Sequence, residues 1–173
     1  MDGSVAGRGC MALMIHVVEK GRALPRAWRV RHGPQGHFPA DLHSALIELV
    51  SGLIPAGAQG GCLGDGACAG TRLQQTGEGD GWSYVCRTGC HRTAWGDSET
   101  LRRDTLGAGR KPGPLVACSA VLLTREAYGS LRRLCGWATG CTAPLSLGTH
   151  MDAAEEACRL YSKRFRLEPC FSD

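Results

Sequence analysis

Residues 10–30 read CMALMIHVV-EKGR-ALPRAWRV, two apolar segments on either side of a four-residue polar turn. The segments, residues 10–18 and 23–30, are rich in residues that fit a pleated, half-buried surface. The polar residues between them include Gly21, which suits a tight turn. The sequence therefore predicts a β-hairpin near the start of the fold.

A helix is predicted after the hairpin. The sequence Gly33-Pro34-Gln35-Gly36 signals a loop, and residues 39–54 then place apolar side chains at helical spacing. Those side chains are Leu42, Leu46, Leu49, Val50 and Leu53. Pro39 near the start and Pro55 beyond the end fit the boundaries of a helix. His43 in this segment is predicted to lie on the helix surface rather than to bind a metal.

Two strands are predicted next, and the first of them delivers a carboxylate. Residues 59–66 read QGGCLGDG, so Asp65 follows a short strand and enters a glycine turn, a position that presents a side chain at the rim of a sheet. The glycines weaken this strand, because glycine adds no packing and loses more chain entropy than other residues. A weak helix is expected at about residues 71–76, and residues 82–87, WSYVCR, form a good strand.

Residues 88–149 are rich in turn residues and short β-capable runs, which predicts a β-rich, mainly antiparallel subdomain before the last helix. The runs lie at residues 115–124, 131–138 and 144–147. The closing segment is helical instead, and Asp152 and Glu155 form a capping-box arrangement at its start. One stripe of this helix consists of Ala154, Cys158, Tyr161 and Phe165.

The order of these elements predicts an α/β fold in a single domain, residues 1–173. A chain of 173 residues with 43% hydrophobic residues is long enough for one core. The net charge is +4, and 17 of the 20 basic residues are arginines, whose planar side chains suit phosphate contacts. A GC-rich genome also raises the arginine content, so both interpretations of this excess stay open.

The ten cysteines do not form the pattern of a secreted disulfide scaffold. They stand mostly alone in apolar runs, where a free thiol behaves as a small hydrophobe, and neither a signal peptide nor a run of membrane-spanning length is recognised. The most closely spaced candidate zinc ligands are Cys86, Cys90 and His91, with Cys135 and Cys141 farther on. Because structural zinc sites usually contain Cys-x2-Cys pairs and this sequence has none, a zinc-stabilised structural protein is the least favoured alternative.

The segment Tyr161-Ser162-Lys163-Arg164-Phe165-Arg166-Leu167-Glu168 spaces a Tyr, an Arg and a Glu three and four residues apart, so that they share one helix face. This Tyr-x2-Arg-x3-Glu pattern resembles the signature around the third catalytic acid of DDE transposases from bacterial insertion sequences. The resemblance extends to Asp2-Gly3-Ser4 before the hairpin and to Leu63-Gly64-Asp65-Gly66 after the first helix. Together with the strand at residues 82–87, it covers nearly the whole chain.

The resemblance implies a ribonuclease H-like fold, which is a mixed sheet flanked by helices, with residues 88–149 as a β-rich insertion before the last helix. It implies DNA transposition, a form of DNA recombination, and double-stranded DNA as the partner, both at the transposon ends and in the target. No membrane partner is expected, and a homodimer in a synaptic complex is compatible with the resemblance. The expected location is the bacterial cytoplasm, in association with the nucleoid.

The resemblance also implies the chemistry of the site. Asp2, Asp65 and Glu168 would be the catalytic and metal-binding residues, with Mg²⁺ or Mn²⁺ as the cofactor. Hard cations require oxygen ligands, and two such ions can make a nucleophile and neutralise the charge on both reacting oxygens. Arg164 is expected to bind a DNA phosphate, and Tyr161 is expected to lie near the DNA strand that is cut.

Some features depart from the family pattern. Asp2 is preceded only by Met1, so most of the family's first central strand is expected to be missing. The family has a Lys seven positions after the Glu, a position beyond Asp173, and Pro169 disfavours helical geometry at Glu168. These departures suggest a fragment or a decayed copy of a transposase, with little or no activity on its own.

Other interpretations of the same residues stay open. Arg164 and Glu168 are four residues apart and could form a surface ion pair, while Asp65 between two glycines could be a turn residue. The alternative function from another class is a non-catalytic nucleic-acid-binding module. Its basic face would consist of Arg102, Arg103, Arg110, Arg132 and Arg133.

Overall fold

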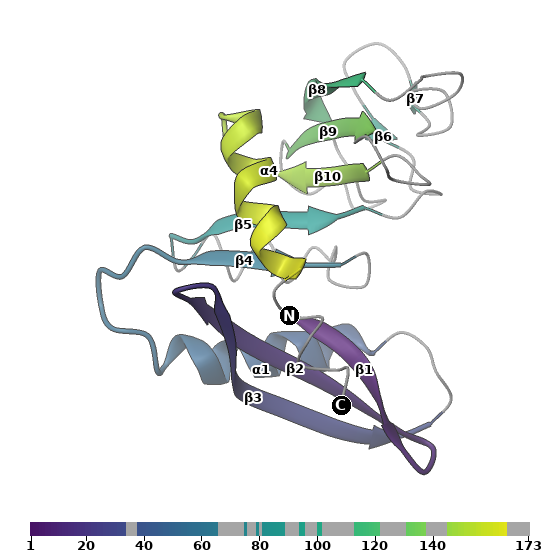
Figure 1. Cartoon of the computed structure of the whole chain (residues 1–173), viewed down its shortest axis with the longest axis vertical. Helices are drawn as coiled ribbons and strands as arrows, with labels where there is room; N and C mark the ends of the chain where they lie inside the picture. Colours follow the sequence, from purple (N-terminus) through teal and green to yellow (C-terminus); the bar gives the residue numbers. More distant parts are fainter. Residues whose placement is uncertain are drawn as a thin grey trace.

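The structure is a computed structural model of the chain. It describes residues 1–33, 38–65, 75, 79, 81–88, 94–95, 100–101, 113–121, 131–137 and 145–165. Within these residues the chain is a mixed α/β protein with a three-stranded sheet, a five-stranded sheet, a two-stranded ribbon and the helices α1 and α4 (Figure 1). The predicted α/β class is therefore confirmed.

The three-stranded sheet contains the predicted hairpin. Its strands are β1 (Asp2–Gly7), β2 (Cys10–Glu19) and β3 (Arg22–His32), antiparallel and in that order. Lys20 and Gly21, between β2 and β3, have φ values of 47° and 78°. Two successive positive φ values are typical of the turn that matches the twist of a two-residue hairpin. The hairpin prediction is confirmed, and its turn lies at these two residues.

Strand β1 is not among the predicted strands. Its sequence is DGSVAG, in which two glycines and an aspartate disfavour a strand. It forms because β2 supplies a partner along its length, and the pairing begins with Asp2 opposite Met14. Asp2 therefore occupies the first position of a paired strand, where the sequence suggests only the remnant of one.

Helix α1 (Ala40–Ser51) covers one face of the three-stranded sheet (Figure 1), which confirms the predicted helix. The first core lies between them and extends to the second sheet. It consists of Met1, Leu13, Ile15, Ala27, Leu46, Ile47, Val50, Tyr84 and Cys86. His43 is only 4% exposed, and its Nδ1 lies 3.0 Å from the carbonyl oxygen of Pro39. The prediction that His43 lies on the helix surface is wrong, because the buried side of α1 includes it.

The five-stranded sheet has the order β4-β5-β10-β9-β8. Its strands are β4 (Gly61–Gly64), β5 (Ser83–Arg87), β8 (Gly113–Val121), β9 (Leu131–Trp137) and β10 (Leu145–Thr149). β4 and β5 are parallel, and the other neighbours are antiparallel. The two strands predicted on either side of residues 71–76 are confirmed, whereas the weak helix predicted there lies outside the described residues except for Gln75.

The strands predicted in the β-rich region are present and antiparallel. β10 pairs directly with β5, so this region continues the sheet that β4 and β5 begin. The two-stranded ribbon of β6 (Ala94–Trp95) and β7 (Thr100–Leu101) also belongs to the region.

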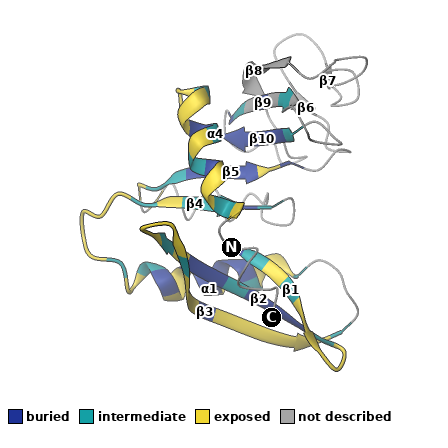
Figure 2. Cartoon of the chain, in the orientation of Figure 1, coloured by how far each residue is buried: buried dark blue, intermediate teal, exposed yellow. Residues whose placement is uncertain are grey.

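Helix α4 (Ala154–Ser162) lies on the five-stranded sheet. The second core beneath it consists of Val85, Leu134, Leu147, Ala157 and Tyr161. On β5, Val85 belongs to this second core, whereas its neighbours Tyr84 and Cys86 belong to the first. Because successive side chains of a strand point to opposite faces, α1 and α4 cover opposite faces of the fold (Figure 2).

Both ends of α4 differ from the prediction. Ala153 is the N-cap and no side chain caps the helix, so the predicted capping box is wrong. The Asp152 carboxylate instead pairs with Arg132, with 2.8 Å between Oδ1 and Nη2. The α-helix ends at Ser162 and continues as a short 3₁₀ turn over residues 163–165, so the predicted regular helix through Glu168 is not observed in the described part of the chain.

The two sheets approach each other where β1 begins and β4 ends. The main-chain nitrogen of Met1 donates a hydrogen bond to the carbonyl oxygen of Leu63 over 2.7 Å. This bond places the start of β1 beside β4, and the first core runs beneath both sheets. No helix in the described part of the chain is long and apolar enough to cross a membrane.

Candidate functional site

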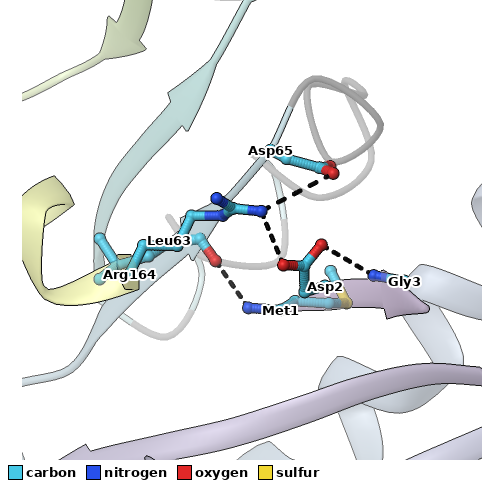
Figure 3. A network of polar contacts seen from close by, with 6 residues as sticks. All are labelled: Met1, Asp2, Gly3, Leu63, Asp65 and Arg164. Atoms are coloured by element: carbon cyan, nitrogen blue, oxygen red, sulfur yellow. Dashed lines mark hydrogen bonds and ion pairs between the residues drawn. The ribbon is translucent and has the colours of Figure 1, made fainter. Parts of the chain in front are cut away.

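Two carboxylates predicted as catalytic meet at the junction of the two sheets. Asp2 is the first residue of β1, and Asp65 directly follows β4. The hydrogen bond from Met1 to Leu63 holds these two strand ends together (Figure 3). The fold thus brings together two acids that are far apart in the sequence, as the prediction requires.

A guanidinium group joins the two carboxylates. Nη2 of Arg164 lies 2.7 Å from Oδ2 of Asp2 and 3.9 Å from Oδ2 of Asp65 (Figure 3). The other oxygen of Asp2, Oδ1, accepts a hydrogen bond of 2.9 Å from the backbone N–H of Gly3. Arg164 reaches this position from the 3₁₀ turn that ends α4. Three separate segments of the chain therefore build the site.

The site is shielded but not closed. The side chains of Arg164 and Asp2 are 13% and 16% exposed, and that of Asp65 is 35% exposed. Solvent or a ligand can therefore approach from the side of Asp65. Nε of Arg164 is buried and has no hydrogen-bond partner in the structure, so the guanidinium makes fewer hydrogen bonds than it can donate.

The charges around Arg164 fix its protonation. Burial opposes the positive charge, but the carboxylates of Asp2 and Asp65 and the nearby Tyr161 outweigh it and raise the pKa of Arg164 above its ordinary value. The guanidinium therefore stays charged and offsets part of the negative charge of the acid pair. Arg164 was predicted to bind a DNA phosphate, whereas in this structure its ligands are the two carboxylates.

Tyr161 lies in the second core rather than on a surface. Its side chain is 2% exposed and packs edge-on against Phe165, with 6.2 Å between the ring centroids. Burial raises the pKa of Tyr161, and the charges of Arg164 and Arg87 oppose this shift. A direct contact of this ring with DNA, as predicted, is not accessible in the observed arrangement. The ring instead fixes the end of α4 from which Arg164 extends.

The third predicted acid, Glu168, lies outside the described residues. Among the described residues, no group of three His, Cys, Asp or Glu side chains is arranged to hold a metal ion. Asp2 and Asp65 are thus a pair of hard oxygen donors. Such donors suit a Mg²⁺-type cation, and the location of Arg164 shows that the pair already holds one positive group.

His16 is a neighbour of the site that the sequence does not reveal. Burial lowers its pKa, the positive charge of the chain start lowers it further, and Asp2 opposes the shift. His16 therefore lies within electrostatic reach of Asp2. His16 lies two residues after Met14, which pairs with Asp2 across the strands. Because this pairing depends on β1, the sequence alone does not indicate that His16 is near the site.

The structure describes only part of the two alternative sites, the candidate zinc ligands and the basic face. Cys86 is completely buried in the first core and behaves as a small hydrophobe, while Cys90, His91 and Cys141 lie outside the described residues. Of the predicted basic face, Arg132 pairs with Asp152. Arg102, Arg103 and Arg110 lie outside the described residues, and the side chain of Arg133 is not described either.

A scan against models of protein families gives no match to this chain, and a search of curated proteins gives none either. The interpretation of the site therefore rests on its geometry and on the resemblance of its motifs.

Proposed function

We propose that the site at Asp2 and Asp65 belongs to a metal-dependent enzyme that cuts and joins DNA phosphodiester bonds. The particular class is the DDE transposase of bacterial insertion sequences, and this chain corresponds to its catalytic domain. DNA transposition is the proposed process, with double-stranded DNA as the substrate and the bacterial nucleoid as the location.

One observation carries the proposal. The first two acids of the motif meet around Arg164, although they belong to β1 and to the end of β4. The shared contact with Arg164 places the Asp2 and Asp65 side chains beside each other. Arg164 is itself part of the motif, so three of its members occupy one place.

The arrangement of strands supports a ribonuclease H-like fold as the finer description. β1, β2 and β3 form consecutive antiparallel neighbours, α1 follows, and β4 then returns to the start of β1. The family places its first Asp on a central strand, whereas β1 is the edge of its three-stranded sheet and meets the end of β4 through the hydrogen bond from Met1 to Leu63. The antiparallel strands after β5 correspond to the proposed β-rich insertion.

The proposed cofactor is Mg²⁺ or Mn²⁺, held by the carboxylates of Asp2 and Asp65. Such a cation, when bound, would activate the attacking oxygen and neutralise charge on the leaving oxygen. Asp2 is pre-oriented by the N–H of Gly3, and Asp65 offers the more exposed carboxylate. Glu168 as the third ligand remains a proposal.

Arg164 determines how readily the acid pair can bind a cation. Its guanidinium contacts Asp2 and lies near Asp65, so it must move or share these carboxylates when a cation enters. We therefore expect weak cation binding and low activity from this chain alone. A homodimer in a synaptic complex would supply the usual setting for strand transfer.

Nicking of supercoiled plasmid DNA in Mn²⁺ or Mg²⁺ tests the proposal. We expect slow nicking that requires the cation and is lost in Asp2→Ala and Asp65→Ala. Asp152→Ala is the matched control, because that side chain is 93% exposed and pairs with Arg132 away from the site. Nicking that survives both site substitutions would contradict the proposal. A chain that neither nicks DNA nor binds the cation would contradict it as well.

A further inference from the structure

We propose that Arg87 binds the DNA phosphate next to the acid pair, the role that the resemblance of motifs implies for Arg164. This inference deepens the proposed function and rests on it for the identity of the phosphate. It assigns a substrate-binding residue that lies outside the predicted motif.

Arg87 and Asp65 lie side by side at one edge of the five-stranded sheet. β4 and β5 are parallel, and the last residue of β4, Gly64, pairs with Cys86. Asp65 and Arg87 each come one residue later, so they are at the same level of the sheet. Because adjacent strands run about 4.8 Å apart, a guanidinium on one and a carboxylate on the other can contact the same ligand.

Both side chains lie on the side of the sheet that α4 covers. Arg87 pairs with Leu147 on β10, and Leu147 is completely buried in the second core under α4. Paired residues point to the same face, so Arg87 extends from the sheet on the side of α4. The Asp65 carboxylate is reached from the end of α4 by Arg164, over 3.9 Å (Figure 3). Arg87 and Asp65 therefore border the same site.

The charges around Tyr161 agree with this placement. Burial raises the pKa of Tyr161, and the positive charges of Arg164 and Arg87 oppose this shift. The negative charge of Asp65 adds to the rise. The three charged side chains thus lie within electrostatic reach of one ring on α4.

Arg87 is the guanidinium of this cluster that a substrate can reach. The Arg164 side chain is 13% exposed and holds Asp2 over 2.7 Å. Arg87 is exposed, and the ion pairs found among the described residues do not include it. A guanidinium presents a planar fork of donors that matches a phosphate. A phosphate held by Arg87 would lie next to Asp65, the more exposed carboxylate of the acid pair.

The charge balance of the site gives Arg87 a definite task. Asp2 and Asp65 carry two negative charges, and Arg164 supplies one positive charge beside them. The remaining negative charge would repel a phosphodiester that approaches from the open side. Arg87 adds a second positive charge at that side, so a DNA phosphate can come close to the carboxylates before any cation is bound.

Fluorescence anisotropy with a short labelled DNA duplex, over a series of salt concentrations, tests the proposal. The buffer contains EDTA, so that no divalent cation bridges the phosphates and the carboxylates. Arg87→Gln should weaken binding about tenfold, the size expected for the loss of one hydrogen bond between charged groups. The dependence of log K on log salt concentration should become shallower by about 0.9, because one phosphate contact is lost.

Further measurements separate a phosphate contact from a general loss of charge or of structure. Arg87→Lys keeps the charge, so it should keep the salt dependence of the wild type. Arg159→Gln removes a guanidinium that is 72% exposed and pairs with Glu156 on α4, and it should bind DNA as the wild type does. Urea unfolding should give Arg87→Gln the same unfolding free energy as the wild type within about 0.5 kcal/mol, because the side chain is exposed.

The outcomes separate this inference from the proposed function. A wild-type affinity and salt dependence in Arg87→Gln would overturn the phosphate site, even if cation-dependent nicking is observed. Equal losses in Arg87→Gln and Arg159→Gln would assign the binding to surface charge in general and overturn it as well. The expected loss in Arg87→Gln alone, without any nicking, would support the phosphate site and contradict the enzyme.

Discussion

Nη2 of Arg164 lies 2.7 Å from Oδ2 of Asp2, a contact between residues 162 positions apart. The same nitrogen lies 3.9 Å from Asp65. One guanidinium thus interacts with two carboxylates at the junction of the sheets. The proposed function and the stability of that junction both depend on this arrangement.

Arg164→Met should destabilise the protein by about 2–3 kcal/mol. Removing one partner of a buried ion pair usually costs about 3–5 kcal/mol, and the 35% exposure of Asp65 reduces the cost here. Urea unfolding monitored by circular dichroism measures the change. Arg159→Met is the control, because its pair with Glu156 is exposed and spans 3.6 Å, and pairs of this kind contribute only about 0.2–0.5 kcal/mol. Equal losses in the two variants would show that the Asp2 contact is not structural.

Leu46→Ala should cost about 2–5 kcal/mol of unfolding free energy, because the side chain is completely buried in the first core. Leu49→Ala on the same helix should change stability by less than about 1 kcal/mol, since Leu49 is 49% exposed. Both substitutions preserve helix propensity, so urea unfolding of the pair measures the contact of α1 with the sheet. A reversed order would mean that another face of α1 packs on the sheet.

Gly21→Ala should destabilise the hairpin by about 1–2 kcal/mol, because its φ of +78° is a left-handed conformation that disfavours a Cβ. A Cβ at this position would meet nothing within 4 Å, so the cost is conformational. Gly52→Ala is the matched control: its φ is −66° and the nearest atom is 3.8 Å away, so a small gain of up to about 1 kcal/mol is expected. Thermal unfolding distinguishes the two signs, and a stabilising Gly21→Ala would contradict the turn.

Stability should fall as the pH rises above about 9. Burial raises the pKa of the Cys62 thiol, and the positive charge of the chain start opposes the shift. As the pH rises, the thiol of the unfolded chain therefore ionises before the thiol of the folded chain. The contribution of Cys62 to the unfolding free energy is complete below the pKa of the unfolded thiol and is lost as the pH rises through the pKa of the folded thiol. The slope of this loss is at most about 1.4 kcal/mol per pH unit. Urea unfolding at pH 7.5 and pH 10 should show a smaller difference in Cys62→Ala than in the wild type. The same pH dependence in both proteins would exclude Cys62 as a cause.

Local patterns are sufficient to predict the hairpin and α1. The turn at Lys20 and Gly21 and the apolar spacing in residues 39–54 act over a few residues, and both elements form where the sequence predicts them. Strand β1 could not be predicted in this way, because its glycine-rich sequence becomes a strand only by pairing with β2. His43 likewise looks polar in isolation, and only the packing of α1 buries it.

In the candidate site, too, the features that depend on short motifs could be predicted and those that depend on the tertiary fold could not. The resemblance of motifs singled out Asp2, Asp65 and Arg164, and the structure brings their side chains together, while their role as a site stays a proposal. The partner of Arg164 was not predictable, because an ion pair across 162 residues depends on the tertiary fold. The burial of Tyr161 follows from the placement of α4 on the sheet, which the helix stripe indicates only in part. Glu168 lies outside the described residues and stays a prediction.

The most direct test of the central claim is the binding of Mn²⁺ measured by electron paramagnetic resonance at neutral pH. The account predicts weak binding to the wild type, tighter binding to Arg164→Gln because both carboxylates lose their counter-ion, and loss of binding in Asp2→Asn and Asp65→Asn. Asp152→Asn, an exposed carboxylate outside the site, should bind as the wild type does. Binding that persists in both Asp2→Asn and Asp65→Asn would contradict the claim that these two carboxylates form a divalent-cation site.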